Sequence, residues 1–216
     1  MEEKEMKNPK LPCKGPVPQD MLEILMNGIF AFAMTLIVKN NIPLPSGNVS
    51  EDIYFFIEFF LSIFFDGFSF IFTFILLAIF YILAFEIMRH CVFIDRFCVY
   101  LIFGFLLTII FIPLSSLLWS ISDVPIPYGI LFHANILISG LILLCLWVHI
   151  FKLPGIIRKS TTKEYINNLS FRISVFPLTA LVGILIDGNE ISFGIVPIII
   201  LYLVPIVMCV RYARDF

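Results

Sequence analysis

The side chains that most often do chemistry in proteins are few in this chain and far apart. The histidines are His90, His133 and His149, and the cysteines are Cys13, Cys91, Cys98, Cys145 and Cys209. None of them falls in a phosphate-binding loop, a zinc-protease helix, a nucleophile elbow or a paired-cysteine motif. Five is an odd number of cysteines, and their spacing does not predict a disulfide framework. We therefore expect neither an enzyme nor a protein that carries a cofactor.

A soft-metal site is the one chemical grouping that the order of residues suggests. His90 and Cys91 are adjacent, and Cys98 follows seven positions after Cys91. Imidazole and thiolate groups are good ligands for soft metal ions. No fourth ligand is near in the sequence, so we predict an ordinary cluster at the membrane interface and no metal.

Acidic residues inside apolar segments are the next candidates, because such residues often mark ion pathways in membranes. Glu23 and Glu86 both lie within about one turn of the end of an apolar stretch. Glu86 can pair with Arg89 three residues later in a helix. This spacing favours an interfacial ion pair, and no series of buried carboxylates indicates a proton-coupled pump.

The composition predicts the elements that hold these residues. Of the 216 residues, 60% are apolar, 16% are aromatic and only 14% are charged, and the mean hydropathy is +1.03. Soluble domains have roughly 45–50% apolar and about 25% charged residues. The chain is therefore predicted to be an integral membrane protein, which excludes a soluble enzyme and a nucleic-acid-binding module.

Six apolar stretches are long enough to cross a bilayer as helices, which takes roughly 20 residues. They cover about residues 22–38, 68–88, 97–119, 128–151, 171–186 and 191–210. Residues 53–65 are apolar but short and contain Glu58, and we expect a short outer helix there. The predicted fold is an all-α integral membrane protein with six transmembrane helices in one bundle, in a membrane domain of residues 21–216 that follows a cytoplasmic tail of residues 1–20.

The positions of Lys and Arg predict the orientation, because these residues prefer the cytoplasmic side in short loops. With six spans and a cytoplasmic N-terminus, thirteen of the fourteen Lys and Arg lie inside and only Lys39 lies outside. A seventh crossing at residues 53–65 would place ten of them outside. We therefore predict a multi-pass protein of the cell membrane with both termini in the cytoplasm, an acidic outer face, and an inner connecting loop over residues 152–170.

The first predicted span has one face of defined composition. At about 100° per residue, five side chains fall within roughly 40° of one direction, and Thr35 lies at about 60° from it. The five are Leu25, Gly28, Phe32, Leu36 and Lys39. The face is thus a short column of apolar side chains with Lys39 at its outer end.

The same span carries the longest likeness to a known family. The run Asn27-Gly28-Ile29-Phe30-Ala31-Phe32-Ala33-Met34-Thr35-Leu36 resembles the first helix of the transmembrane protein 175 family of potassium channels. Their signature there is Arg-x-x-x-Phe-Ser-Asp-Gly-Val-Phe-Ala-Ile-Ala-x-Thr-Leu. Two further segments are similar, namely Val92-Phe-Ile-Asp95-Arg96 in the second loop and Ile112-Pro113-Leu-Ser-Ser late in the third span. The single six-span unit is similar to the prokaryotic members.

The resemblance implies a homotetramer in the lipid bilayer that conducts potassium or another monovalent cation. In that family the first helix of each subunit lines a central pore with an apolar constriction. Carried over position by position, the constriction falls on Phe32. The hydroxyl layer falls on Thr35, and the next apolar ring falls on Leu36.

Several positions depart from the family pattern. The signature Arg is Met21 here and the signature Asp is Asn27, whereas the Gly is retained as Gly28. The His-His pair of the second span corresponds to Ala84 and Phe85. The resemblance therefore implies that apolar packing replaces the polar network that holds the first helix in those channels.

Two functions follow from these observations. The first is a cation channel with a hydrophobic constriction. The alternative is a non-conducting divergent paralogue that keeps the bundle and has lost the pore, which is favoured by Phe32 at the constriction, Lys39 at the mouth and the altered signature. An enzyme or a transporter with an intramembrane site has no candidate residues.

Overall fold

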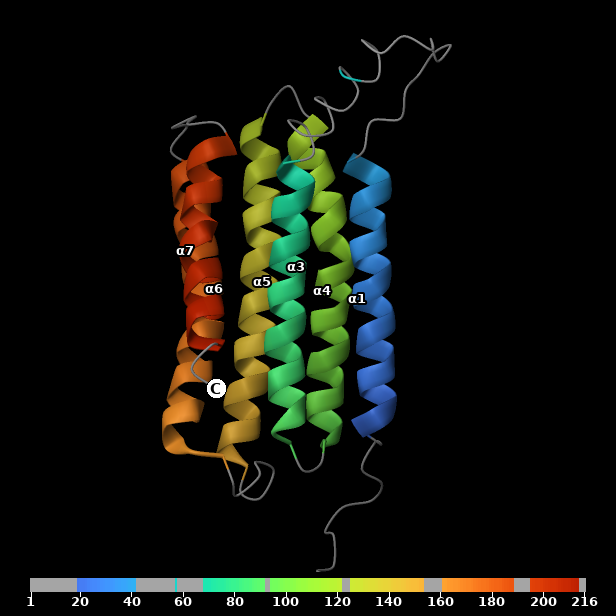
Figure 1. Cartoon of the computed structure of the whole chain (residues 1–216), viewed down its shortest axis with the longest axis vertical. Helices are drawn as coiled ribbons and strands as arrows, with labels where there is room; N and C mark the ends of the chain where they lie inside the picture. The colour runs from blue at the N-terminus through green and yellow to red at the C-terminus, as the bar shows by residue number, and fades with distance from the viewer. Residues whose placement is uncertain are drawn as a thin grey trace, which may run out of the picture.

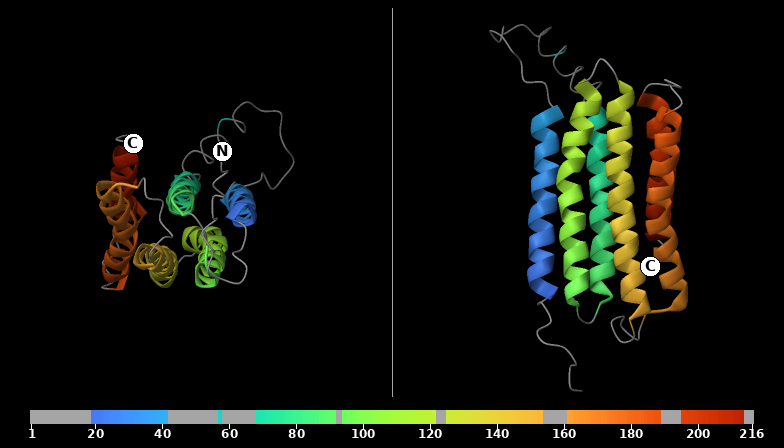
Figure 2. Two further views of the ribbon diagram at one scale, coloured as in Figure 1. Left: turned by 90° about the horizontal axis from the view of Figure 1, so that it is seen from below. Right: turned by 180° about the vertical axis from the view of Figure 1, so that it is seen from behind.

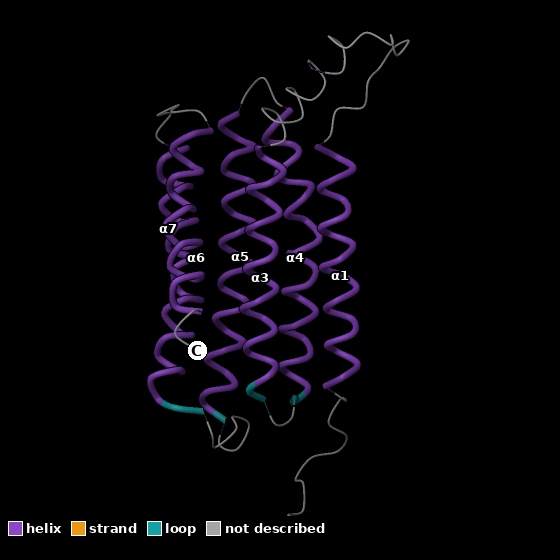
Figure 3. The backbone as a smooth tube through the Cα atoms, viewed as in Figure 1, coloured by secondary structure: helices purple, strands orange, loops and turns teal. Residues whose placement is uncertain are grey.

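The long apolar runs form helices, because in hydrocarbon every backbone N–H and C=O must be bonded within its own segment. A computed structural model describes residues 19–41, 57, 68–91, 94–121, 125–153, 161–188 and 195–213. Its helices are α1 (Gln19–Asn41), α3 (Phe68–Arg89), α4 (Arg96–Ile121), α5 (Pro125–Lys152), α6 (Lys163–Gly188) and α7 (Ile195–Ala213). They lie side by side along one axis (Figure 1), and nearly all of the described backbone is helical (Figure 3). The predicted all-α bundle is confirmed.

Five of these helices are long and apolar enough to cross a membrane by length and composition. Their apolar spans are Gln19–Ile37, Ile71–Arg89, Arg96–Leu118, Gly129–Lys152 and Lys163–Gly188. In α7 the described apolar segment is the shorter Ile200–Arg211. The chain is a multi-pass membrane protein.

The directions of the helices place the end of α1 relative to the start of α3. Consecutive helices alternate in direction, and α1 ends at the same end of the bundle at which α3 begins (Figure 1). The end of α1 and the start of α3 therefore lie on the same side of the bundle. The outer helix that we expect at residues 53–65 lies outside the described residues, apart from Ile57, which is helical.

The packing places α1 at one edge of the bundle. It packs against α3 and α4, while α5 packs between α4 and α6, and α7 packs against α6 and α3. Seen from below, α1 and the pair α6–α7 lie on opposite sides of the molecule (Figure 2). The centre of the core is aromatic, because the ring of Phe80 lies 6.1 Å from that of Phe105 and 5.1 Å from that of Phe176.

The start of α6 differs from the sequence prediction. We expected a polar connecting loop over residues 152–170, but α6 begins at Lys163. Thr162 caps it, since its hydroxyl accepts the backbone N–H of Tyr165 at 3.3 Å. Trp147 of α5 then donates its indole N–H to Ser170 Oγ at 2.7 Å. The first two turns of α6 contain many polar residues, so a prediction based on apolar stretches places the start of this helix too late.

Candidate functional site

The predicted pore helix α1 has one covered face and one open face. Its buried side chains follow a helical repeat and pack on the bundle: Leu22, Met26, Phe30, Ala33 and Ile37. The side chains on the opposite side are exposed. Only 28% of the apolar span of α1 is buried, against 39–56% in the other four long spans. Of these five helices, α1 has the largest share of its surface without a partner in its own chain.

Two of the predicted pore residues lie on the open face of α1. Phe32 is 56% exposed, so it is not packed between helices of its own chain. Thr35 is exposed, and its hydroxyl donates to the carbonyl of Ala31 at 2.8 Å. Leu36 is half-buried at the boundary between the two faces. The side chain of Lys39 lies outside the described residues.

The three positions of the family signature are also on or near this open face. Met21, Asn27 and Gly28 are all exposed. A Cβ added at Gly28 would have no neighbour within 4 Å. The packing of a single chain therefore does not require glycine at this position.

The contact between α1 and α3 corrects the expectation of purely apolar packing. Tyr81 donates its hydroxyl to Asn27 Oδ1 at 3.0 Å, and Gln19 donates its amide to the carbonyl of Met88 at 2.8 Å. Tyr81 also meets Phe30 edge-on, with 5.3 Å between ring centroids. Ala84, which stands at one of the two histidine positions of the family pattern, is buried. Two hydrogen bonds thus hold α1 against α3 in addition to apolar contacts.

A buried ion pair joins α3 to α6, and it corrects a second prediction. Arg172 Nη1 lies 2.7 Å from Glu86 Oε2, and Tyr165 donates its hydroxyl to the same oxygen at 3.3 Å. Glu86 is therefore not the partner of Arg89 that the spacing of three residues suggested. Arg172 lies inside α6 and is buried.

A polar group that the sequence did not predict joins α5, α6 and α7. His133 is buried, and its Nδ1 lies 2.8 Å from Tyr202 Oη. The planes of the two rings differ by 13°, and the ring centroids are 5.6 Å apart. His133 Nε2 lies 3.5 Å from Asp187 Oδ2. The three residues are dispersed over the last third of the chain and the start of α5, so no spacing in the sequence links them.

His133 also fixes the approach of α6 to α5. A Cβ at Gly183 would lie 2.7 Å from two atoms of the His133 ring, Cε1 and Nδ1, which is closer than real side chains allow. Glycine is thus required at this position by the imidazole on the neighbouring helix.

His90, Cys91 and Cys98, which the sequence analysis grouped together, contact different partners. His90 Nδ1 lies 3.2 Å from Thr161 Oγ1, and the Cys91 thiol donates to the carbonyl of Ile87 at 3.2 Å. Cys98 instead lies beside Asp95 and His149, and one ligand atom from each of these three residues lies within 4.8 Å of the others. The prediction missed this group because His149 is 54 residues away from Asp95 in the sequence.

Asp95 is the residue that organises this group. Its Oδ1 accepts the backbone N–H of Cys98 at 3.0 Å, which caps the start of α4, and its Oδ2 lies 3.1 Å from His149 Nε2. Burial acts to raise the pKa of Asp95. The hydrogen bonds from Cys98 and His149 outweigh burial, so the pKa of this carboxyl is lowered.

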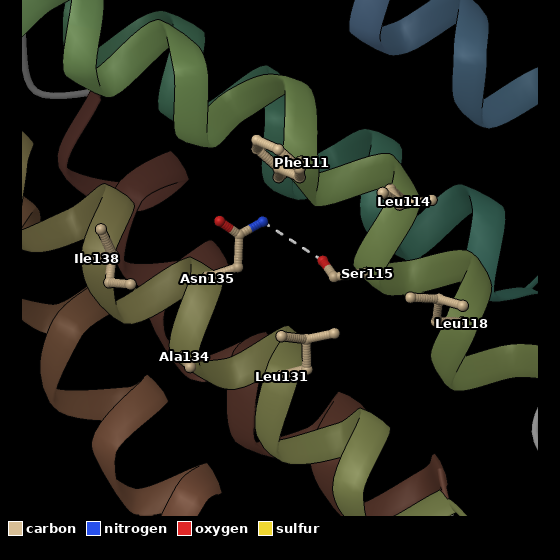
Figure 4. Close-up of a pocket in the computed structure, with 8 residues that line it drawn as sticks. All are labelled: Phe111, Leu114, Ser115, Leu118, Leu131, Ala134, Asn135 and Ile138. Atoms are coloured by element: carbon tan, nitrogen blue, oxygen red, sulfur yellow. Dashed lines mark hydrogen bonds between the residues drawn. The ribbon is translucent and has the colours of Figure 1, made fainter.

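An apolar crevice of about 180 Å³ lies between α4 and α5 (Figure 4). Its polar lining consists of Ser115 and Asn135, and the amide of Asn135 donates to Ser115 Oγ at 3.4 Å. Phe111, Leu114 and Leu131 also line it and are exposed. The crevice therefore opens to the outside of the bundle, where a membrane would bring lipid.

Two comparisons with known proteins found a likeness. The family model described as the endosomal/lysosomal potassium channel TMEM175 matches residues 21–113, which run from α1 into α4. A crystal structure of a lysosomal potassium-selective channel TMEM175 homolog from Chamaesiphon minutus has the same fold, with a TM-score of 0.67. The match covers 91% of this chain and 97% of that chain at 17% identity. No curated protein matches the chain.

Proposed function

The family model and the shared fold confirm the predicted likeness to the TMEM175 potassium channels, and from this premise we propose that the chain is one subunit of a potassium-type cation channel. The observation that carries the proposal is the open face of α1. An apolar helix at the edge of the bundle leaves Phe32 and Thr35 exposed, at the positions where the family resemblance implies a pore.

The pore requires several copies of the chain. One helix cannot enclose an ion path, because polar paths at membrane depth must be surrounded by protein or water. In a closed ring, the same face of each subunit is turned toward the axis. We propose a homotetramer, which the family resemblance implies, with the open face of α1 on the axis.

The constriction is assigned to Phe32. Apolar rings at a narrow point gate a pore by excluding water. Thr35 is one turn further along α1, and its hydroxyl donates to the carbonyl of Ala31, which leaves its oxygen lone pairs for a cation. Leu36 forms the next apolar layer in this arrangement.

The orientation in the cell membrane follows from the charges. The ends of α3, α5 and α7 and the starts of α4 and α6 carry basic residues, namely Arg89, Lys152, Arg211, Arg96 and Lys163. We propose that this end of the bundle and both termini, including the tail of residues 1–20, are cytoplasmic.

A non-conducting paralogue is the second candidate, and Phe32 is the observation that favours it. Four phenylalanine rings at one level leave no room for a hydrated ion. Phe32 therefore either closes a pore that can open, or blocks the axis of the tetramer permanently.

Potassium flux into liposomes that contain the purified protein tests the proposal. We expect Phe32→Ala to raise the flux several-fold, because the ring no longer fills the axis. Phe103→Ala is the matched control, since Phe103 is 51% exposed on α4 and not on α1. Absence of flux from both the wild type and an assembled Phe32→Ala tetramer would contradict the channel and leave the paralogue.

A further inference from the structure

We propose that Asp95, Cys98 and His149 form a binding site for a divalent metal ion of the zinc class. The site lies where α4 begins and α5 ends, away from the open face of α1. A carboxylate oxygen from the residue before α4, a thiol sulfur from α4 and an imidazole nitrogen from α5 lie within 4.8 Å of one another. Each is a different kind of zinc ligand.

The distances suit a small tetrahedral ion. With metal–oxygen and metal–nitrogen distances of about 2.0–2.1 Å and metal–sulfur of about 2.3 Å, neighbouring oxygen and nitrogen ligands lie about 3.3 Å apart. Asp95 Oδ2 and His149 Nε2 are 3.1 Å apart, so this edge of the tetrahedron is already formed. A sulfur and a nitrogen ligand need about 3.5 Å. Since the three ligand atoms lie within 4.8 Å of one another, a shift of about 1.3 Å or less by the Cys98 sulfur would close the other edges.

The carboxylate is held in position before a metal binds. Asp95 Oδ1 accepts the backbone N–H of Cys98, which turns Oδ2 toward His149. Hydrogen bonds of this kind orient the ligands in known metal sites. Asp95 can therefore serve as the cap of α4 through one oxygen and as a metal ligand through the other.

The kinds of ligand select the kind of ion. Potassium, magnesium and calcium sites are built from oxygen atoms, whereas a thiolate with an imidazole and one carboxylate suits zinc. Cys98 is buried, but the side chains of Asp95 and His149 are 30% and 27% exposed. Solvent thus reaches the site, and a water molecule can take the fourth position. On binding, the Cys98 thiol gives its proton to solvent and a metal–sulfur bond replaces the S–H bond.

Cobalt(II) is the probe for this site, because it replaces zinc and its thiolate bonds absorb in the near ultraviolet. We expect the purified full chain, without a histidine tag, to bind one cobalt ion with a thiolate band that zinc abolishes. Cys98→Ser should lose the band, and His149→Gln should weaken binding at least tenfold. Cys145→Ser is the matched control, since Cys145 is an exposed cysteine on the same helix as His149.

Asp95→Asn separates a metal site from a simple helix cap. Asparagine also caps helices, so this variant should keep the thermal stability of the wild type and still lose at least tenfold in cobalt affinity. A wild-type chain without a thiolate band would overturn the proposal, and so would a band that survives Cys98→Ser or disappears in Cys145→Ser. Potassium flux is not the readout, so the outcome is independent of the proposed channel function.

Discussion

Arg172 of α6 and Glu86 of α3 form a 2.7 Å ion pair inside the bundle, although they are 86 residues apart in the sequence. Their side chains are only 4% and 18% exposed. Tyr165 donates a further hydrogen bond to the same carboxylate. The pair therefore fixes the height of α6 against α3, and each charge depends on the other to offset its loss of water.

We expect Glu86→Gln to lower the free energy of unfolding by about 3–5 kcal/mol, because it leaves the guanidinium of Arg172 buried without its counter-charge. Replacing both partners, as Glu86→Leu with Arg172→Met, should restore much of this loss. Thermal unfolding of the detergent-solubilised protein measures the effect. Arg89→Gln is the control, since Arg89 is exposed and is the partner that the sequence spacing suggested. Equal destabilisation by Arg89→Gln and Glu86→Gln would show that the buried pair is not the stabilising contact.

Gly183 provides a second test of the packing. Gly183→Ala would place a methyl group 2.7 Å from the His133 ring, and overpacking of this kind costs about 1–3 kcal/mol. Gly104→Ala is the matched control, because its Cβ would meet only Ile142 Cδ1 at an ordinary 3.9 Å. We expect a lower melting temperature for Gly183→Ala and no loss for Gly104→Ala. Equal melting temperatures for the two variants would contradict the close approach of α6 to His133.

The helices were predictable from the sequence because a backbone that crosses hydrocarbon has few alternatives to the α-helix. The backbone N–H and C=O groups of such an apolar run must form hydrogen bonds within the run itself. Five of the apolar stretches therefore predicted the long helices directly. The start of α6 was missed because Lys163, Glu164 and Asn167 are polar and only the cap at Thr162 marks it.

The partners of individual side chains were not predictable. Glu86 has Arg89 three residues away, and a rule based on spacing selects that residue before Arg172. His133 and Tyr202 are 69 residues apart, and only the packing of three helices brings them together. Similarly, the helical wheel groups Phe32 with Leu36, but contact with the neighbouring helices leaves Leu36 half-buried and Phe32 open.

The orientation of the bundle predicts which introduced cysteines can be labelled from outside the cell. Ser46→Cys, between α1 and α3, should react with a membrane-impermeant maleimide on intact cells beyond the level of the wild type. Lys163→Cys is the control, since Lys163 is exposed at the start of α6 at the opposite end of the bundle. It should react only after permeabilisation. The reverse pattern would place both termini outside.

Lys39 is the residue at which the charge of the pore mouth can be tested. It follows Phe32 by two turns of α1 and differs from it by about 20° on the helical wheel, so in a tetramer four lysines would surround the mouth. A cation about 6 Å from each ammonium would be repelled by about 3 kcal/mol per lysine at an effective dielectric constant near 20. Pairing with Glu51 or Asp52, or extension to the headgroups, would remove this barrier.

We expect Lys39→Leu to raise potassium flux and to shift the reversal potential toward that of potassium, because the variant removes the repulsion at the mouth. Lys152→Leu is the matched control, since Lys152 is an exposed lysine at the other end of the bundle. Its flux and reversal potential should equal those of the wild type. If Lys39→Leu changes neither quantity in an assembled tetramer, the ammonium groups lie away from the pore or are neutralised by the outer carboxylates. The double variant Glu51→Gln with Asp52→Asn distinguishes these two cases. If the two carboxylates neutralise Lys39, their removal should lower the potassium flux of the chain that has Lys39 and leave the flux of Lys39→Leu unchanged.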